Sequence, residues 1–313
     1  MTEDQRQQSV DLPNETRRAE IAVTVFGLVL PTLVTLVYFV GLASAPELTQ
    51  QIAYGACKTF QFLLPVIWVC LIRRERIRLP ENPLHGVIGG IGFGLVISLA
   101  MVALYSLWLK PSGLMDGPAV LVRDKVLGIG VDGVEKYFVM GLFYSLIHSF
   151  FEEYYWRWFI FGRLQRWTSL IAAVVVSSLG FMAHHVLVVA TFFGWTNPLT
   201  YFLSISVAVG GAMWAILYRR SGNLVAPWLS HLIVDAAHPR RVAGGDRLGR
   251  LGGRDIEEHV GVGIEEIDEP LNRRRGSHDT LLGKGRQLVR LYRAQRQLWM
   301  TRPPVVEEPA VRR

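Results

Sequence analysis

The stretch Phe151–Leu164, FEEYYWRWFIFGRL, places two adjacent glutamates and an arginine in an otherwise apolar and aromatic segment. The residues before it, KYFVMGLFYSLIHSF (Lys136–Phe150), are as apolar as a membrane span. Ionisable side chains are costly inside hydrocarbon, so by default they are candidates for function. We therefore expect this helix to lie in or beside a membrane, with carboxylates that carry the chemistry of the protein.

The composition of the chain indicates a membrane protein. Half of the 313 residues are hydrophobic and the mean hydropathy is +0.28, which is too apolar for an ordinary soluble domain. The net charge of +7 does not indicate nucleic-acid binding, because the basic residues before residue 238 fall between apolar blocks. The two cysteines, Cys57 and Cys70, have neither metal-site nor disulfide spacing.

Apolar segments along the chain predict an all-α fold, a polytopic transmembrane bundle of about seven helices. Loops rich in Lys and Arg alternate with loops that are poorer in positive charge, which places the N-terminus in the cytoplasm. We expect the membrane to be a bacterial-type inner membrane. Four glycines in the third span, between residues 89 and 94, favour close helix packing. The predicted spans are residues 21–43, 53–72, 84–109, 136–151, 170–193, 198–218 and 223–237.

The two adjacent carboxylates are predicted to have different roles. Glu153 and Arg157 are four residues apart, so a helix places them together as an ion pair. Glu152 points about 100° away from Glu153 and cannot share its position. Arg157 would keep Glu153 ionised, which leaves Glu152 as the carboxylate available for proton transfer.

Histidines at the same spacing occur in two later spans. His185 follows Phe181 by four residues, and Asp235 follows His231 by four. A carboxylate and a histidine that share a water can deprotonate it for attack on a carbonyl carbon. A further pair of polar groups could stabilise the oxyanion that this attack creates.

Several of these polar side chains also have a structural interpretation. The Glu153–Arg157 pair could lock two helices together without acting in a reaction. His148 is more simply read as a packed polar residue, and His184 and His185 could be interfacial residues capped by backbone carbonyls. Lys58 could extend toward the membrane surface or pair with an acid. An interfacial aromatic belt is the simplest interpretation of the neighbouring residues Tyr154, Tyr155, Trp156 and Trp158.

Three motifs resemble those of the CPBP intramembrane protease family. EEYYWR (152–157) fits E-E-x-x-x-R, FMAHH (181–185) fits F-x-x-x-H, and HLIVD (231–235) fits H-x-x-x-N/D. They occur in this order, each in or beside an apolar span. The family includes the type II CAAX prenyl endopeptidases and the bacteriocin-processing and immunity proteins.

The resemblance implies a helical, membrane-embedded peptidase that acts on a peptide or a prenylated protein. Its motifs assign water activation to Glu152 and His185. An ionised Asp235 cannot donate to an oxyanion, so it would have to be protonated or else orient His231. The implied roles are thus water activation by Glu152 and His185, support by Glu153 and Arg157, and oxyanion stabilisation by His231 and Asp235.

The sequence leaves two alternatives for the cofactor, namely no cofactor or a zinc ion. The chain lacks H-E-x-x-H, the strong zinc signature, and we favour a metal-free reaction. The alternative is a three-ligand zinc site made by Glu152, His185 and His231, with one open position.

The predicted organisation has four parts, and other functions compete with proteolysis. The tail is basic and polar, and we expect it to be disordered or translated from a shifted reading frame. The alternative functions are a non-catalytic membrane immunity or scaffold factor and, less favoured, a proton-coupled transporter. The predicted parts are a cytoplasmic segment (1–20), N-terminal transmembrane helices (21–79), a CPBP-like protease core (80–237) and the tail (238–313).

Overall fold

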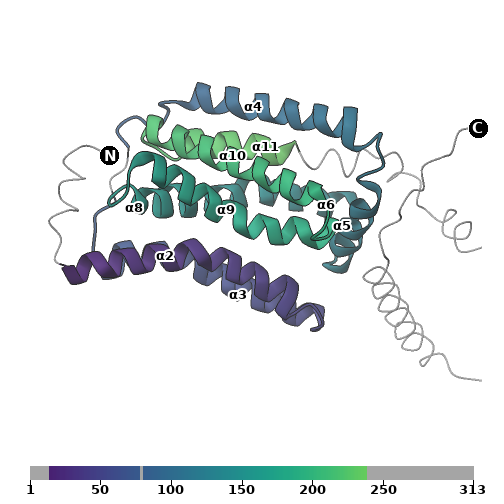
Figure 1. The fold of residues 1–313 in the computed structure, drawn as a ribbon, viewed down its shortest axis with the longest axis horizontal. Coiled ribbons are helices and arrows are strands. Elements are labelled where there is room, and N and C mark those ends of the chain that lie inside the picture. Colours follow the sequence, from purple (N-terminus) through teal and green to yellow (C-terminus); the bar gives the residue numbers. More distant parts are fainter. Residues whose placement is uncertain (1–13, 78–79, 238–313) are drawn as a thin grey trace, which may run out of the picture. The chain divides into compact units, whose positions relative to one another are not determined.

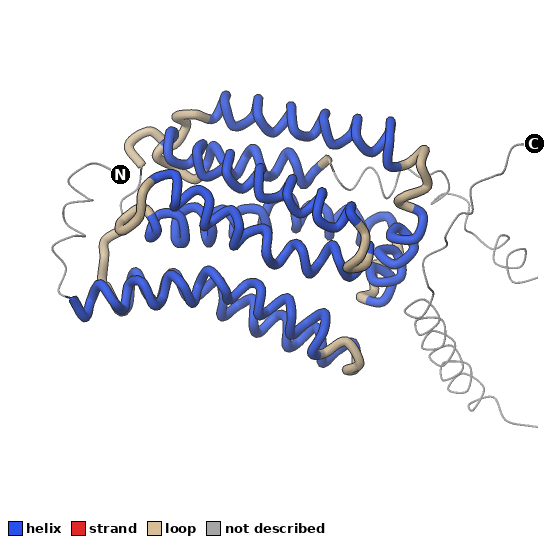
Figure 2. The backbone as a smooth tube through the Cα atoms, viewed as in Figure 1, coloured by secondary structure: helices blue, strands red, loops and turns tan. Residues whose placement is uncertain are grey.

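The computed structural model describes residues 14–77 and 80–237, and every regular element in these ranges is a helix (Figures 1 and 2). The all-α prediction is therefore confirmed for the described residues. The predicted tail, residues 238–313, lies outside them.

Five helices within the described ranges are long and apolar enough to cross a membrane. Large apolar side chains remain exposed along them, such as Ile88 at 89% and Ile171 at 78%, as expected for surfaces that face lipid. Each of the first three spans continues from an α-helix into a π-helical segment. The five are α2 (Asn14–Leu36) with η1 (Val37–Gly41), α3 (Glu47–Val66) with η2 (Ile67–Ile72), α4 (Val87–Leu104) with η3 (Tyr105–Leu109), α9 (Leu170–Phe193) and α10 (Pro198–Ser221).

The prediction of about seven spans is not confirmed. One predicted span is the N-terminal part of a longer continuous helix, residues 134–164, here called the motif helix, whose charged side chains interrupt its apolar run. Another is α11 (Val225–Ala236), whose 12 residues extend only about 18 Å at 1.5 Å per residue. The predicted 110–135 loop contains a helix, α5 (Asp116–Gly128). The motif helix consists of α6 (Val134–Leu142), η4 (Phe143–His148), α7 (Ser149–Glu153), η5 (Tyr154–Phe161) and α8 (Gly162–Leu164).

Short polar connections join the motif helix, α9, α10 and α11. The Ser169 hydroxyl caps α9 by accepting from the Ala172 N–H at 3.2 Å. Asn197 caps α10 in the same way, and Pro198 occupies its first turn. Gly222 ends α10 in the left-handed region (φ +68°), where glycine is favoured. Local sequence thus fixes the turns that bring the three motifs back through one bundle.

The helices pack in successive layers (Figure 1). α3 lies on α2, α2 on α9, α9 on α10, and α11 beneath α4. The motif helix contacts α2, α3, α9, α10 and α11. A helix surrounded on so many sides can bury charged groups away from lipid.

Buried aromatic residues of the motif helix form the core of the bundle. Tyr155 and Trp156 are at most 1% exposed, and the Tyr155 hydroxyl donates to the Gly27 carbonyl at 2.6 Å. The prediction of an interfacial belt is therefore wrong for these two residues. Tyr and Trp fit a core when their polar atom has a partner, and here α2 supplies it for Tyr155.

Glycines of α4 allow its backbone to touch that of α11. A side chain at Gly90 would collide with the carbonyl of Ala226, and one at Gly94 would lie 2.8 Å from the Ser230 carbonyl oxygen. The close packing predicted from the glycines is confirmed at these two positions. At Gly92 nothing lies within 4 Å of the position that a Cβ atom would occupy, so this glycine does not face α11.

Candidate active site

Glu153 is the buried centre of the site, and its side chain has no exposed surface. Its Oε2 lies 3.1 Å from Arg157 Nε on the same helix, so the predicted ion pair is present. Its Oε1 accepts a 2.8 Å hydrogen bond from Nδ1 of His231 on α11. One carboxylate therefore ties the first motif to the third.

Arg157 is held by α9 and α10 as well as by Glu153. Its guanidinium lies over the rings of Phe181 and Trp214, 4.8 and 5.2 Å from their centroids. Its NH2 group donates to the Gly211 carbonyl at 3.3 Å. A planar cation suits both stacking and hydrogen bonding, which a lysine could not combine. Phe181, the first residue of the second motif, thus has a specific partner.

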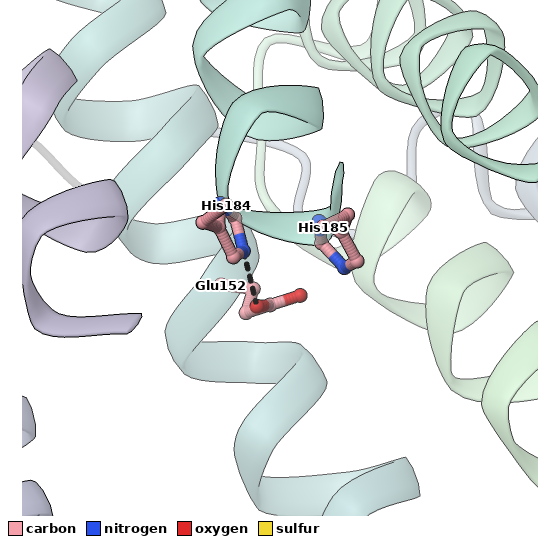
Figure 3. A group of neighbouring side chains, drawn as sticks. All are labelled: Glu152, His184 and His185. Carbon is pink, nitrogen blue, oxygen red and sulfur yellow. Dashed lines mark ion pairs between the residues drawn. The ribbon is translucent and has the colours of Figure 1, made fainter. Parts of the chain in front are cut away.

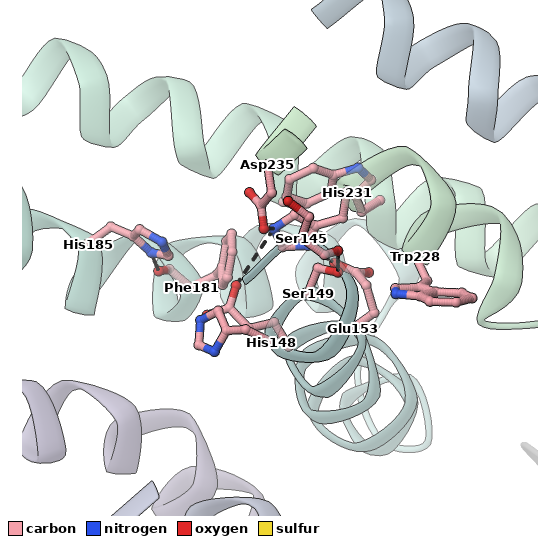
Figure 4. Close-up of polar contacts among 12 residues, drawn as sticks. Ser145, His148, Ser149, Glu153, Phe181, His185, Trp228, His231 and Asp235 are labelled. Atoms are coloured by element: carbon pink, nitrogen blue, oxygen red, sulfur yellow. Dashed lines mark hydrogen bonds and ion pairs between the residues drawn. The ribbon is translucent and has the colours of Figure 1, made fainter. Parts of the chain in front are cut away.

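His231 lies among three carboxylates, Glu152, Glu153 and Asp235, of which the last two are labelled near it in Figure 4. Its ring stacks on Trp214, with centroids 4.0 Å apart and planes 16° apart. Its Nε2 is 3.7 Å from Glu152 Oε2 and 3.7 Å from Asp235 Oδ2, while Nδ1 faces Glu153. A neutral imidazole donates from one nitrogen only, whereas an imidazolium donates from both. Only the imidazolium satisfies Glu153 and still presents an N–H toward Glu152 and Asp235.

Glu152 is buried but only loosely paired. Its oxygens lie 3.3 Å from His148 Nε2, 3.8 Å from His184 Nε2 and 3.7 Å from His231 Nε2. These separations exceed the 2.8 Å bond that Glu153 makes with His231. Charge-assisted hydrogen bonds are usually about 2.7–2.9 Å long. Glu152 therefore keeps acceptor capacity for a water or a substrate group.

His185 is oriented by its own helix. Its Nδ1 lies 2.8 Å from the Phe181 carbonyl oxygen, an acceptor that requires a proton on Nδ1. In the neutral ring Nε2 then carries a lone pair, which makes it a base or a ligand. The F-x-x-x-H spacing is the i, i+4 spacing that this side-chain-to-carbonyl bond needs.

Comparison with protein-family models adds an independent result. Residues 134–237 match the model described as type II CAAX prenyl endopeptidase Rce1-like. The resemblance to the CPBP family is confirmed over these residues. They contain the motif helix, α9, α10 and α11, and therefore all the predicted site residues. Comparison with curated proteins and with solved structures gave no match.

The Rce1-like segment and the apolar helices together support an integral membrane protein of protease type. The match begins at residue 134, so the predicted core boundary at residue 80 stays a prediction. Residues 14–77, which form α2 and α3 with their π-helical continuations, lie outside the match.

Three side chains of the Rce1-like segment could bind a metal ion, and one of the three differs from the predicted zinc ligands. Glu152, His184 and His185 offer one ligand atom each, and these atoms all lie within 4.8 Å of one another (Figure 3). The predicted third ligand was His231 in place of His184. His231 Nδ1 is already bonded to Glu153, and its Nε2 also faces Asp235.

Three residues near Glu152 were not assigned to the site from the sequence. His184 stacks on Trp156 with planes 4° apart, and this contact directs its Nε2 toward Glu152. His148 precedes Glu152 by four residues, a spacing that could have identified their contact. Lys58 of α3 interacts electrostatically with Glu152. No local pattern indicates that α3 lies against this part of the bundle.

A second charged group, here called the Glu20–Glu75 cluster, joins α2 and the segment after η2 to the end of the motif helix. Glu20 pairs with Arg73 at 2.9 Å and with Arg163 at 3.1 Å. Glu75 pairs with Arg163 and Arg166, both at 2.9 Å. Burial alone would raise the pKa of Glu75, but hydrogen bonds and charge from the two arginines lower it to about 2. The sequence predicted these arginines only as loop charges that set membrane orientation.

Proposed function

We propose that this chain is an intramembrane endopeptidase that hydrolyses a peptide bond of a membrane-associated or prenylated substrate. The observation that carries the proposal is the approach of Glu152 and His185, whose ligand atoms lie within 4.8 Å. A water hydrogen-bonded to both at about 2.8 Å could bridge up to roughly 5.6 Å. The separation of the pair is therefore one that a single shared water can bridge.

In the proposed reaction Glu152 is the general base. It takes a proton from the water as the water oxygen bonds to the scissile carbonyl carbon. The lone pair on His185 Nε2 accepts the water's other hydrogen and directs the attack. Protonated Glu152 then transfers its proton to the leaving amine, and the C–N bond breaks.

The imidazolium of His231 stabilises the oxyanion of the intermediate. Its Nε2–H points to the space beside Glu152, and Glu153 holds the ring through Nδ1. Asp235, ionised, orients the ring and leaves donation to the imidazole. Arg157 balances the charge of Glu153 and keeps that carboxylate in place. This arrangement assigns a role to each of the six residues that the motifs selected.

The reaction as proposed needs no metal, because Glu152 and His185 supply the base and the orientation of the water. Two imidazoles and a carboxylate are nevertheless a donor set that zinc accepts. Glu152, His184 and His185 would hold the ion, each offering one ligand atom. A bound zinc ion would lower the pKa of its water and polarise the carbonyl.

We further propose that the N-terminus lies in the cytoplasm, in a bacterial-type inner membrane. Arg17 and Arg18 lie just before the first apolar run, and Arg219 and Arg220 lie in the last turn of α10. Such residues concentrate on the cytoplasmic side of membrane proteins. Attachment of a membrane-impermeant label to single cysteines placed in alternate loops tests the orientation.

Peptide cleavage by the detergent-solubilised full chain tests the function. Glu152→Gln should lower the cleavage rate by about 10²–10⁴-fold, the usual contribution of a general base. Glu135→Gln, at an exposed position on the same helix, is the matched control and should keep the rate. Retained cleavage by the Glu152 variant would overturn the mechanism. Loss of cleavage with a zinc chelator would replace the metal-free reaction by a zinc-dependent one.

A further inference from the structure

The connection that follows η2 begins with the sequence RRERI (73–77) and lies outside the Rce1-like segment. Its alternate side chains have different surroundings. Arg73 and Glu75 each form an ion pair of 2.9 Å within the Glu20–Glu75 cluster. Arg74 and Arg76 are exposed. The cluster therefore fixes one side of this connection to the bundle and leaves two arginines on the other side.

The backbone of Arg74 has an uncommon conformation. Among the described residues it is the one non-glycine residue with a positive φ, at +51°. This left-handed conformation is unfavourable for a residue that carries a Cβ atom. The ion pairs of Arg73 and Glu75, on either side, hold the chain in it. Strain that the surroundings maintain in this way is frequent where a protein holds a ligand, which makes Arg74 a candidate binding residue.

The two exposed arginines have no anionic partner in the described part of the chain. Neither Arg74 nor Arg76 makes an ion pair within 4.0 Å or a side-chain hydrogen bond there. Large apolar side chains beside them in the sequence are also exposed, namely Leu71, Ile72 and Ile77. A guanidinium binds a phosphate through two parallel hydrogen bonds. Two guanidiniums next to exposed apolar side chains therefore match the headgroup phosphate and the acyl chains of a phospholipid.

Further exposed arginines lie at the same end of the bundle. The Glu20–Glu75 cluster joins the start of α2 to the end of the motif helix, and the rings of Phe161 and Tyr218 are 6.2 Å apart, which places the last turn of α10 there as well. The exposed acids beside these segments are Glu15 and Glu81, so positive charge is in excess. Such a surface attracts anionic lipids. The additional arginines are Arg17, Arg18, Arg219 and Arg220.

We propose that Arg74 and Arg76 bind the headgroup phosphate of an anionic phospholipid, whose acyl chains lie against the neighbouring exposed apolar side chains. The bound lipid holds the connection on the Glu20–Glu75 cluster and so strengthens the attachment of α3 to the motif helix. Arg163 of the cluster is 11 residues from Glu152, about 16 Å along the helix axis at 1.5 Å per residue. The lipid site is thus separate from the candidate active site, and the inference does not depend on the proposed cleavage.

Thermal unfolding of the full chain tests the site, in detergent micelles that contain either phosphatidylglycerol or the same mole fraction of phosphatidylcholine. Wild type should unfold at a higher temperature with phosphatidylglycerol, because a ligand that binds the folded state stabilises it. High salt should reduce the difference. The double variant Arg74→Gln, Arg76→Gln should lose most of it. The matched control Lys110→Gln, Lys136→Gln, which changes exposed lysines at the opposite ends of α4 and the motif helix, should keep it.

Binding of fluorescently labelled phosphatidylglycerol to the same proteins gives the affinity directly. Each arginine near an anionic lipid surface contributes about fivefold in affinity, so the double variant should bind roughly 25-fold more weakly. Unlabelled phosphatidylglycerol should displace the probe, and inorganic phosphate at the same concentration should not. Because the two lipids are compared within each protein, a change in the intrinsic stability of a variant does not affect the result.

Three results would overturn the proposal. The first is equal unfolding temperatures of wild type in the two lipids. The second is displacement of the probe by inorganic phosphate, which would make this a site for small anions. The third is an equal loss of binding in the double variant Arg17→Gln, Arg18→Gln, which would assign the effect to the net charge of this end of the bundle. Loss of binding confined to the Arg74 and Arg76 variant supports the site.

Discussion

The Glu20–Glu75 cluster and the Glu152–Glu153 site use similar side chains in different ways. In the cluster, each carboxylate is bound by two arginines at 2.9–3.1 Å. In the site, Glu153 has one hydrogen bond of 2.8 Å to His231 and an ion pair of 3.1 Å with Arg157, but Glu152 has only contacts of 3.3 Å or more, all with histidines. Carboxylates with close cationic partners hold helices together, whereas a carboxylate with only longer contacts to histidines is available for proton transfer. The difference lies in partner type and distance rather than in the presence of charge.

Arg157→Met should have the largest effect on stability, because it removes one of the two cationic partners of the buried Glu153 and leaves only His231. Breaking a buried pair by removing one partner typically costs about 3–5 kcal/mol. We expect a large fall in thermal stability in detergent, with cleavage abolished. The double variant Arg157→Met, Glu153→Gln removes both charges. If it regains thermal stability but little cleavage activity, the pair supports both properties. An Arg157→Met protein as stable as wild type would contradict the buried ion pair.

Gly90→Val should have the next largest effect, because a side chain there collides with the backbone of α11 at Ala226. Overpacking of this kind costs about 1–3 kcal/mol. Displacement of α11 would also move His231. The cleavage rate should therefore fall further than the loss of folded protein alone explains. Gly92→Val adds the same atoms where nothing lies within 4 Å, and it should leave both properties near wild type.

The Glu20–Glu75 cluster should make the protein sensitive to acid. The folded-state pKa of Glu75 is about 2, below its usual 4.5, so its contribution to stability is present above pH 4.5 and is lost as the pH falls toward 2. The shift corresponds to at most about 3 kcal/mol, and solvent screening reduces it. Glu75→Gln should lower the unfolding temperature at pH 6, and the difference from wild type should shrink by pH 3. A constant difference at both pH values would contradict this role.

Arg166→Met should have the smallest effect. Arg166 is 30% exposed, and Glu75 would keep its bond to Arg163. Exposed ion pairs contribute about 0–1 kcal/mol. The variant should unfold within a few degrees of wild type and cleave peptide at the same rate. A large loss of activity would mean that the cluster positions the motif helix more tightly than its contacts indicate.

The sequence predicted well what short-range geometry determines. The i, i+4 spacing identified the Glu153–Arg157 pair, because it forms within one helix. Helical geometry also predicted that Glu152 and Glu153 have different partners. Apolar length identified the five long helices, since the span of a helix depends on residue count.

Contacts between distant segments were beyond prediction from local patterns. His184 faces Glu152 because Trp156, on another helix, supports its ring. The arginines at the end of the motif helix were interpreted by their position in a loop, while their partners Glu20 and Glu75 lie roughly 90–140 residues away in the chain. Such pairings depend on how helices pack, which hydropathy does not specify.

The shortness of α11 has a consequence for the lipid around the protein. Its 12 residues cannot cross a hydrocarbon layer about 30 Å thick. Asp235, one residue before the end of α11, is 25% exposed, while Glu152 and Glu153 are 7% and 0% exposed. A carboxylate that is exposed within the hydrocarbon layer draws water inward and thins the bilayer locally. The proposed hydrolysis consumes one water per bond, and we expect water drawn in beside α11 to resupply it.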